Sequence, residues 1–194
     1  KTMRPCVESN IPLRIKNTFN PDHPGTVILA KGTGKNGAIK AVTAIKDLSL
    51  ITVEGTGMVG VPGIAARTFG AVASSDVSVL LISQASSEQS ICFSVPAAAA
   101  DTVIESLSLE FTEELKRRDI DSIWAMRDVS IVTIVGAGMR GTPGISGRVF
   151  SSLGNNKINV IAIAQGSSEC SISIVVAAED TGFAVAHIHE LITA

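Results

Sequence analysis

Cysteine is scarce in this chain of 194 residues, and its three cysteines, Cys6, Cys92 and Cys170, form no C-x-x-C pair. An odd number without paired spacing indicates neither a disulfide framework nor a zinc site, so we expect a reducing, cytoplasmic setting. Long apolar runs are also missing, since none reaches the length of about 18 residues that crosses a bilayer. The sequence therefore predicts a protein without a membrane partner.

An excess of charge of either sign is absent as well. The formal net charge is -2, and 18% of the residues are charged. Nucleic-acid-binding domains carry a basic patch or stripe that attracts the phosphate backbone, and no such footprint is present here. Nucleic acid is therefore not an expected partner.

Residue sets that carry catalysis or hold a metal cannot be assembled. His23 stands alone in a segment rich in turn residues, and neither serine-rich block has a base at a readable spacing. His187 and His189 are two residues apart on a predicted helix, where side chains at that spacing point away from each other. We predict no catalytic residue, no metal site and no cofactor within this chain.

What the chain does contain is a duplication. The block Gly55–Ile64 returns as Gly136–Ile145, an offset of 136 − 55 = 81 residues. Without a gap, 22 of the 54 positions from Val42 to Val95 are identical to their counterparts from Ile123 to Val176. The chain is therefore expected to hold two copies of one structural unit.

Each copy of the block spells a glycine turn between a strand and a helix. Glycine suits positive φ or close approach to the backbone, and Pro62 and Pro143 suit the first turn of a helix. The N-terminus of a helix presents free N–H groups and favours an anion such as a carboxylate or phosphate. A ligand at the turn is one interpretation, and a turn that serves packing alone is the other.

A glutamine follows each turn at the same distance, Gln84 in the first copy and Gln165 in the second. Each stands at the end of an apolar predicted strand, near the level of the turn. An amide carbonyl can accept a hydrogen bond from an ammonium group while the helix end binds a carboxylate. Together these groups describe a site for a free amino acid, unless the glutamines simply face water.

The predicted fold class is α+β, with two ferredoxin-like units whose antiparallel sheets carry helices on one face. Each unit reads strand, helix, strand, strand, helix, and the fourth strand comes from Ile123 to Met126 or from a partner. The third strand of the first unit alternates apolar and polar residues around Phe93, so one face is expected to be buried and the other polar. The sheet face away from the helices is expected to be covered by a neighbour. The predicted helices are Pro62 to Ser74, Pro143 to about Gly154, Ala97 to Lys116, and Glu179 to Ile192.

The blocks also match the glycine pattern G-x-G-x-x-G of dinucleotide-binding folds. The acidic residue that should end the second strand and hold a ribose hydroxyl is absent, and Gln84 and Gln165 stand there instead. The next predicted element is an antiparallel strand rather than a crossover helix. A nucleotide-binding enzyme is therefore the least favoured interpretation.

The paired glycine turns, followed by Ser-Gln-Ala-Ser-Ser-Glu and Ala-Gln-Gly-Ser-Ser-Glu, resemble the tandem ACT domains of aspartate kinases. The N-terminal motif Asn17-Thr18-Phe19-Asn20-Pro21 resembles the segment that enters the regulatory region of that family. The resemblance implies a connector over residues 1–40, one ACT domain over 41–118 and a second over 119–194. It also implies a homodimer through the ACT domains and a kinase lobe, absent here, that uses ATP and Mg.

The resemblance further implies feedback regulation by an amino acid, with threonine favoured by the glutamines and lysine as the alternative. A purely structural dimerisation module is the competing hypothesis. Carried over by position, the effector site comprises Met58, Val59, Gly60, Val61, Gln84, Ser146, Asn159 and Val160. An equivalent second site would comprise Met139, Arg140, Gly141, Thr142 and Gln165.

Overall fold

The structure is a computed structural model that describes residues 3–29, 39–84 and 87–193, and the chain divides into two compact units. The smaller unit, residues 1–35, contains helix α1 (Met3–Glu8) and strands β1 (Leu13–Ile15) and β2 (Thr26–Ile28). The two strands pair with each other in antiparallel orientation. The larger unit, residues 36–194, contains the duplication.

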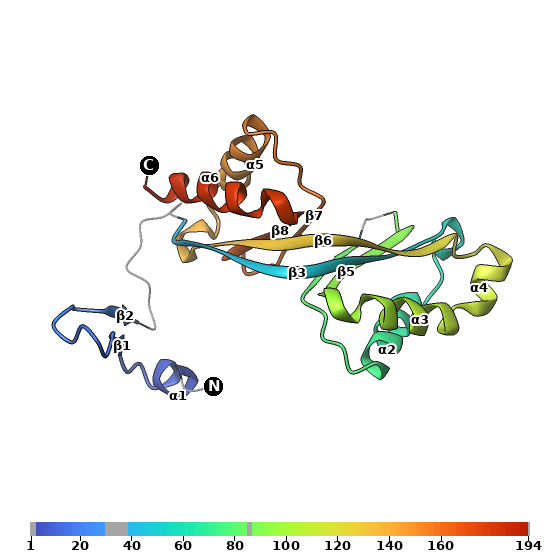
Figure 1. Ribbon diagram of the computed structural model, residues 1–194, viewed down its shortest axis with the longest axis horizontal. Helices are drawn as coiled ribbons and strands as arrows, with labels where there is room; N and C mark the ends of the chain where they lie inside the picture. The colour runs from blue at the N-terminus through green and yellow to red at the C-terminus, as the bar shows by residue number, and fades with distance from the viewer. Residues whose placement is uncertain (1–2, 30–38, 85–86, 194) are drawn as a thin grey trace. The chain divides into compact units, whose positions relative to one another are not determined.

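A single six-stranded antiparallel sheet runs through the larger unit (Figure 1). Its strand order is β4-β5-β3-β6-β8-β7. The first copy of the repeat supplies β3 (Ala41–Glu54), β4 (Leu81–Gln84) and β5 (Ser90–Pro96). The second copy supplies β6 (Ser122–Val135), β7 (Ala162–Gln165) and β8 (Ser171–Ala177). The two copies therefore share one sheet, joined through β3 and β6.

The two central strands are long because each serves both halves of the sheet. Both β3 and β6 have 14 residues, and each bends at an aspartate with positive φ, Asp47 at 58° and Asp128 at 53°. Beyond the bend in β3, Leu50–Glu54 pairs with β5 on one side and with Ser122–Met126 on the other. The prediction that the segment around Ile123 to Met126 supplies a fourth strand is thus confirmed for the first half.

The fourth strand of the second half comes from the start of β3. Ala41–Ile45 pairs with Ile131–Val135 of β6, which pairs in turn with β8. Each copy therefore lends a strand segment to the other. This exchange leaves both halves with four strands and a continuous sheet between them.

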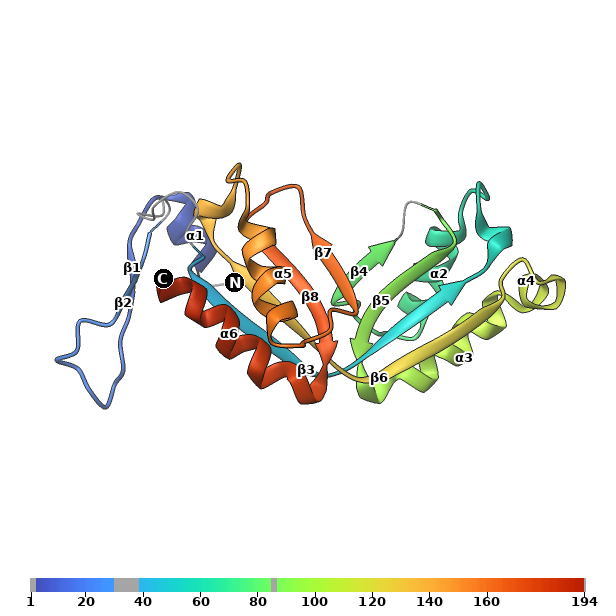
Figure 2. The same ribbon diagram turned by 90° about the horizontal axis from the view of Figure 1, so that it is seen from above.

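Helices cover one face of each half of the sheet (Figure 2). The first half carries α2 (Ile64–Ser74), α3 (Ala100–Glu110) and α4 (Thr112–Arg117). The second half carries α5 (Ile145–Asn155) and α6 (Thr181–Thr193). The class of fold predicted from the sequence, two α+β units with antiparallel strands and helices on one face, is confirmed.

Several helix boundaries differ from the predictions, and α6 begins at Thr181 rather than at Glu179. Helices α2 and α5 begin after Gly63 and Gly144, whose φ values are 93° and 89°, so Pro62 and Pro143 lie outside them. The helix expected from Ala97 to Lys116 is divided, because the backbone leaves helical geometry at Phe111, which is fully buried. A 3-10 turn over Ala97–Ala99 precedes α3.

Two cores lie between the sheet and its helices, one in each half. A third cluster lies on the opposite face, where Leu48, Leu50, Val129 and Ile131 of the central strands meet. Ser94, one of the polar residues expected on this face of β5, is fully buried because the face is covered. The sheet curves so far that its two end strands, β4 and β7, come into contact and cover that face (Figure 2).

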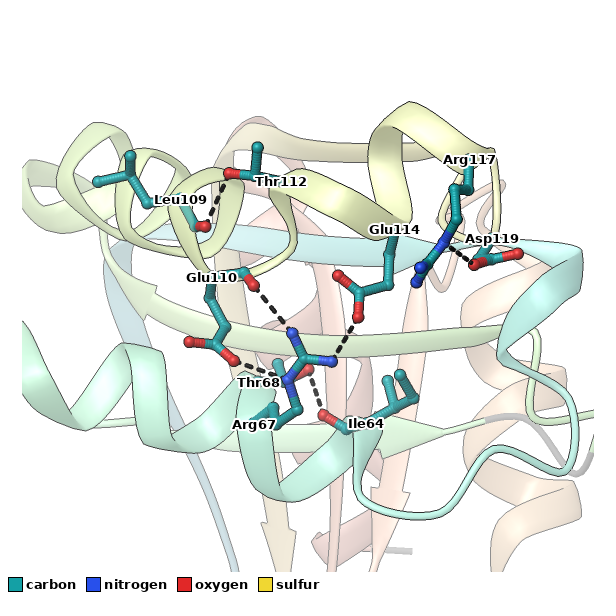
Figure 3. A network of polar contacts seen from close by, with 9 residues as sticks. All are labelled: Ile64, Arg67, Thr68, Leu109, Glu110, Thr112, Glu114, Arg117 and Asp119. Carbon is teal, nitrogen blue, oxygen red and sulfur yellow. Dashed lines mark hydrogen bonds and ion pairs between the residues drawn. The ribbon is translucent and has the colours of Figure 1, made fainter.

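One ion-pair network fastens the helices of the first half together (Figure 3). Arg67 of α2 donates to Glu110 Oε1 at 2.7 Å and to Glu114 Oε1 at 2.5 Å. Its guanidinium also lies 4.7 Å from the centroid of the Phe111 ring. The hydrogen bond from Arg67 lowers the pKa of Glu114, and the two carboxylates raise the pKa of Arg67. The network therefore connects α2 to the junction between α3 and α4.

Candidate functional site

The glycine turn after β3 consists of a short 3-10 helix, Thr56–Met58, followed by two residues that need positive φ. Met58 is buried and anchors the turn to the core of the first half. Gly60 has a φ of 69° and Gly63 a φ of 93°, a region that side chains with a Cβ rarely adopt. The turn after β6 repeats this course, with Gly141 at 64° and Gly144 at 89°. The prediction that these glycines take positive φ is confirmed.

A carboxylate closes each turn, which the sequence reasoning missed. Glu88 Oε2 accepts a hydrogen bond from the N–H of Gly60 at 2.9 Å, and Glu169 Oε2 accepts one from Gly141 at 2.7 Å. These N–H groups are therefore engaged, not bare as expected for a ligand. The only sequence signal was the equal separation of 28 residues between glycine and glutamate in both copies.

A pocket of about 300 Å³ opens between the first turn and the start of α2. Its lining combines the turn, the first residues of α2, the end of β4 and the carboxylate of Glu88. The residues are Met58, Gly60, Val61, Pro62, Gly63, Ile64, Ala65, Gln84, Glu88 and Ile91. We call it the α2 pocket; its volume lies at the lower end of the range for small-molecule sites.

A pocket of about 230 Å³ occupies the equivalent place in the second half, and we call it the α5 pocket. It is lined by Met139, Thr142, Pro143, Gly144, Ile145, Ser146, Gly147, Gln165, Glu169 and Ile172. Nine of these positions correspond to lining residues of the α2 pocket at the repeat offset. The duplication has therefore produced two pockets with one design.

Four of the residues expected at the first effector site, Met58, Gly60, Val61 and Gln84, line the α2 pocket together. Val59 lies in the same turn, but its side chain is half exposed and is not part of the lining. The structure thus brings most of the turn and its glutamine to one cavity.

The three residues expected from the second copy lie elsewhere. Ser146 lines the α5 pocket, Asn159 is exposed, and Val160 packs against the core of the second half. None of them lines the α2 pocket of the same chain. Asn159 and Val160 correspond to residues 78 and 79 of the first copy, which also lie outside the lining of the α2 pocket.

Most of the second set also gathers at one place. Met139, Thr142 and Gln165 line the α5 pocket. The N–H of Gly141 donates a hydrogen bond to Glu169 Oε2. Arg140 is exposed and lies outside the lining. The expected second site is therefore a cavity built in the same way as the first.

The two glutamines connect these pockets to a third cavity, of about 510 Å³, between β4 and β7. Gln84 lines both this cavity and the α2 pocket, and Gln165 lines both this cavity and the α5 pocket. Ser83 Oγ donates to the carbonyl of Ile163 at 3.0 Å across the same junction. The ends of β4 and β7 therefore lie between the two pockets.

The chemistry of each pocket suits a small zwitterion. Helices α2 and α5 begin without a hydrogen bond from a capping side chain, so their first N–H groups favour an anion at the pocket. The carboxylate and the glutamine carbonyl supply acceptors for a cation. Within residues 3–29, 39–84 and 87–193, no three metal-ligating side chains gather to hold an ion. No helix in that part of the chain could span a membrane.

Comparison with known proteins gives one consistent family. Residues 51–111 and 132–191 match the ACT domain. Over 176 residues the chain is 42% identical to the bifunctional aspartokinase/homoserine dehydrogenase of Haemophilus influenzae. The aligned region covers 91% of this chain and 22% of that protein. A second relative, the chloroplastic bifunctional aspartokinase/homoserine dehydrogenase 1 of Zea mays, is 43% identical over 93% of this chain and 20% of its own length.

A solved structure agrees with the sequence relatives. The aspartate kinase of Clostridium acetobutylicum superposes with a TM-score of 0.85 at 26% identity, over 99% of this chain and 44% of that chain. The chain spans about a fifth of the length of the curated relatives that it matches. The region that this chain shares with these relatives contains the two turns and their pockets.

Proposed function

The chain belongs to the ACT domain family, as the regulatory part of an aspartokinase, and on this premise we propose that it is an allosteric sensor of a free amino acid. The observation that carries the proposal is the repeated pocket. Each copy combines a helix N-terminus with a carboxylate and a glutamine, in a cavity of about 300 or 230 Å³. Such a pocket has complementary groups for both charges of an amino acid.

Threonine is the effector that we propose first, with lysine as the alternative. Both copies keep the glutamine that resembles the threonine-sensitive aspartate kinases, and the relatives described above include enzymes fused to homoserine dehydrogenase. The proposed role is feedback inhibition of the synthesis of aspartate-family amino acids. We place the effector in the α2 pocket and in the α5 pocket.

In this proposal residues 1–40 connect to a kinase lobe of the same polypeptide, which binds ATP and Mg. Residues 41–118 and 119–194 form two ACT domains that exchange strand segments. A homodimer forms through these domains, in the cytoplasm, where the three free cysteines stay reduced. The effector regulates by differential binding, because a ligand shifts an equilibrium only by its preference for one state.

Calorimetric titration of the 194-residue chain with threonine, lysine and methionine tests the proposal. We expect heat and saturation with threonine, and none with methionine. The double variant Gln84→Ala, Gln165→Ala is the matched control, and threonine binding should weaken in it. Absence of binding with all three amino acids would contradict a sensor.

A structural dimerisation module is the second candidate, and the packing around the turns supports it. Met58 and Met139 are buried, so both turns also contribute to the cores. For such a module the titrations would show no heat, while sedimentation would still show a dimer. The two measurements together separate the candidates.

A further inference from the structure

The α2 pocket and the α5 pocket share a frame but differ at two lining positions. Val61 of the first corresponds to Thr142 of the second, and Ala65 corresponds to Ser146. The α5 pocket thus carries two hydroxyl groups where the α2 pocket carries methyl groups. The glycine turn, carboxylate and glutamine are the same in both pockets, so these two positions are where the pockets can differ in selectivity.

The two hydroxyl groups of the α5 pocket have different hydrogen-bonding states. Thr142 Oγ1 donates to the carbonyl of Gly138 at 3.0 Å, so its proton is used and its oxygen retains lone pairs as an acceptor. Ser146 is half-buried, and within the described residues no protein group hydrogen-bonds to its hydroxyl. Ser146 is therefore free to donate.

A ligand hydroxyl needs this combination, because it is both a donor and an acceptor. It can donate to Thr142 Oγ1 and accept from Ser146 Oγ. The methyl groups of Val61 and Ala65 offer neither interaction. A pocket with placed polar groups rejects an analogue that lacks the hydroxyl, since its own groups then lose their partner.

We propose that the α5 pocket recognises the hydroxyl of a hydroxylated amino-acid effector, whereas the α2 pocket binds its effector without reading a hydroxyl. The inference rests on the proposed function that both pockets bind free amino acids. It assigns side-chain selectivity to Thr142 and Ser146. It also makes the two pockets different in kind, although they descend from one repeat.

Threonine and valine are the probes that test this assignment, because they have nearly the same shape and differ by a hydroxyl. Amide NMR shifts of Gly63 and Gly144 report on the two pockets separately in one titration of the 194-residue chain. At Gly144 we expect threonine to bind about tenfold more tightly than valine, as one or two ordinary hydrogen bonds allow. At Gly63 the two affinities should agree within about twofold.

Two variants locate the preference. In the double variant Thr142→Val, Ser146→Ala, the preference for threonine over valine reported at Gly144 should fall to about the value reported at Gly63. Ser146→Ala alone keeps the bond from Thr142 to Gly138 and should lose part of the preference. A reciprocal variant, Val61→Thr, Ala65→Ser, should gain a preference for threonine at Gly63.

The outcomes separate this inference from the proposed function. If both glycines respond to threonine and valine with equal affinities, or the preference survives in the double variant, the assignment is wrong and the sensor stands. If neither glycine responds to any amino acid, the proposed function and the assignment both fall.

Discussion

At the scale of single residues, the two glutamates that close the turns are the most consequential finding. Glu88 and Glu169 both have positive φ, at 56° and 55°, which is uncommon for a residue with a side chain. This backbone geometry accompanies a carboxylate directed to the N–H of the turn glycine in each copy. Each glutamate therefore both shapes its turn and adds a negative charge to its pocket.

Replacing Glu88 should loosen the turn. Glu88→Ala removes a hydrogen bond to a charged acceptor, so exchange of the Gly60 amide hydrogen should accelerate about tenfold or more. Glu88→Gln keeps a carbonyl acceptor and should preserve most of the protection. Hydrogen exchange followed by NMR measures both variants. Equal protection of Gly60 in the alanine variant and the wild type would mean that the bond does not hold the turn.

The glutamines give a second prediction at this scale. If the side-chain carbonyl of Gln84 accepts a hydrogen bond from the ammonium group of the effector, Gln84→Ala should lower the affinity for threonine about tenfold to a hundredfold. This range corresponds to the loss of one charge-assisted hydrogen bond. Gln165→Ala should cause a similar loss at the α5 pocket. Both side chains are exposed, so the thermal midpoint should barely change. Calorimetry checks the affinities, and threonine binding at wild-type strength in the double variant would refute the role.

Residue patterns predicted part of this site. The glycines of the turns and the glutamines at the strand ends were identifiable, because positive φ strongly favours glycine and both features recur at the same offset. The bond from Glu88 to Gly60 was not, since a hydrogen bond across 28 residues depends on where a loop returns. The resemblance placed Ser146 at the first effector site, whereas it lines the α5 pocket, just as its repeat equivalent Ala65 lines the α2 pocket.

At the scale of elements, the Arg67 network decides how α2 is held against α3 and α4. Arg148, the equivalent residue in α5, donates to the carbonyl of Leu191 at 3.2 Å and so provides a matched comparison. Arg67→Met should lower the free energy of unfolding by about 1 kcal/mol or less, because the ion pairs are partly exposed. Arg148→Met should have a smaller effect. Urea unfolding measures both, and equal effects would contradict a special role for the ion pairs.

The same network gives a pH dependence with a defined sign. Arg67 lowers the pKa of Glu114 below its ordinary value of 4.5 in the folded state. The contribution of this pair to stability is therefore fully present above pH 4.5 and declines as the pH falls through the lowered pKa. Stability measured from pH 7 to pH 3 should decline less in Glu114→Gln than in the wild type. Identical profiles would exclude this pair as a contributor.

Elements were predicted well in kind and less well in extent. Helices α2 and α5 were predicted at the right places, but each begins after a glycine with positive φ, so proline did not mark the first turn. The period of two identified the strands. It could not reveal that β3 and β6 each belong to both halves, because alternation specifies a face and not a partner strand.

At the scale of the whole larger unit, the exchanged strands predict that its two halves unfold together. The single tryptophan, Trp124, lies in the part of β6 that pairs with the first half. Ile174→Ala, a fully buried change in the core of the second half, should cost about 2 to 5 kcal/mol. Tryptophan fluorescence and circular dichroism should both shift to the same lower urea concentration.

A matched control is Ile163→Ala on β7, whose side chain is 45% exposed and which should shift the midpoint little. Two separate transitions, with the fluorescence of Trp124 unaffected by Ile174→Ala, would show that the halves are independent. Cooperativity of this kind would transmit a change in either half to the other.

The register of β3 on β6 also contains a record of ancestry. Thr43 pairs with Thr133, and the positions that correspond to them at the repeat offset, Trp124 and Thr52, pair with each other as well. This reciprocity is the rule of a twofold symmetric contact between identical subunits. A single copy of the repeat would complete its sheet by exchanging strand segments with a second, identical subunit. Joining two such genes would place the same dimer within one chain. In such a fused chain the two copies can diverge independently, as Val61 and Thr142 at equivalent positions have.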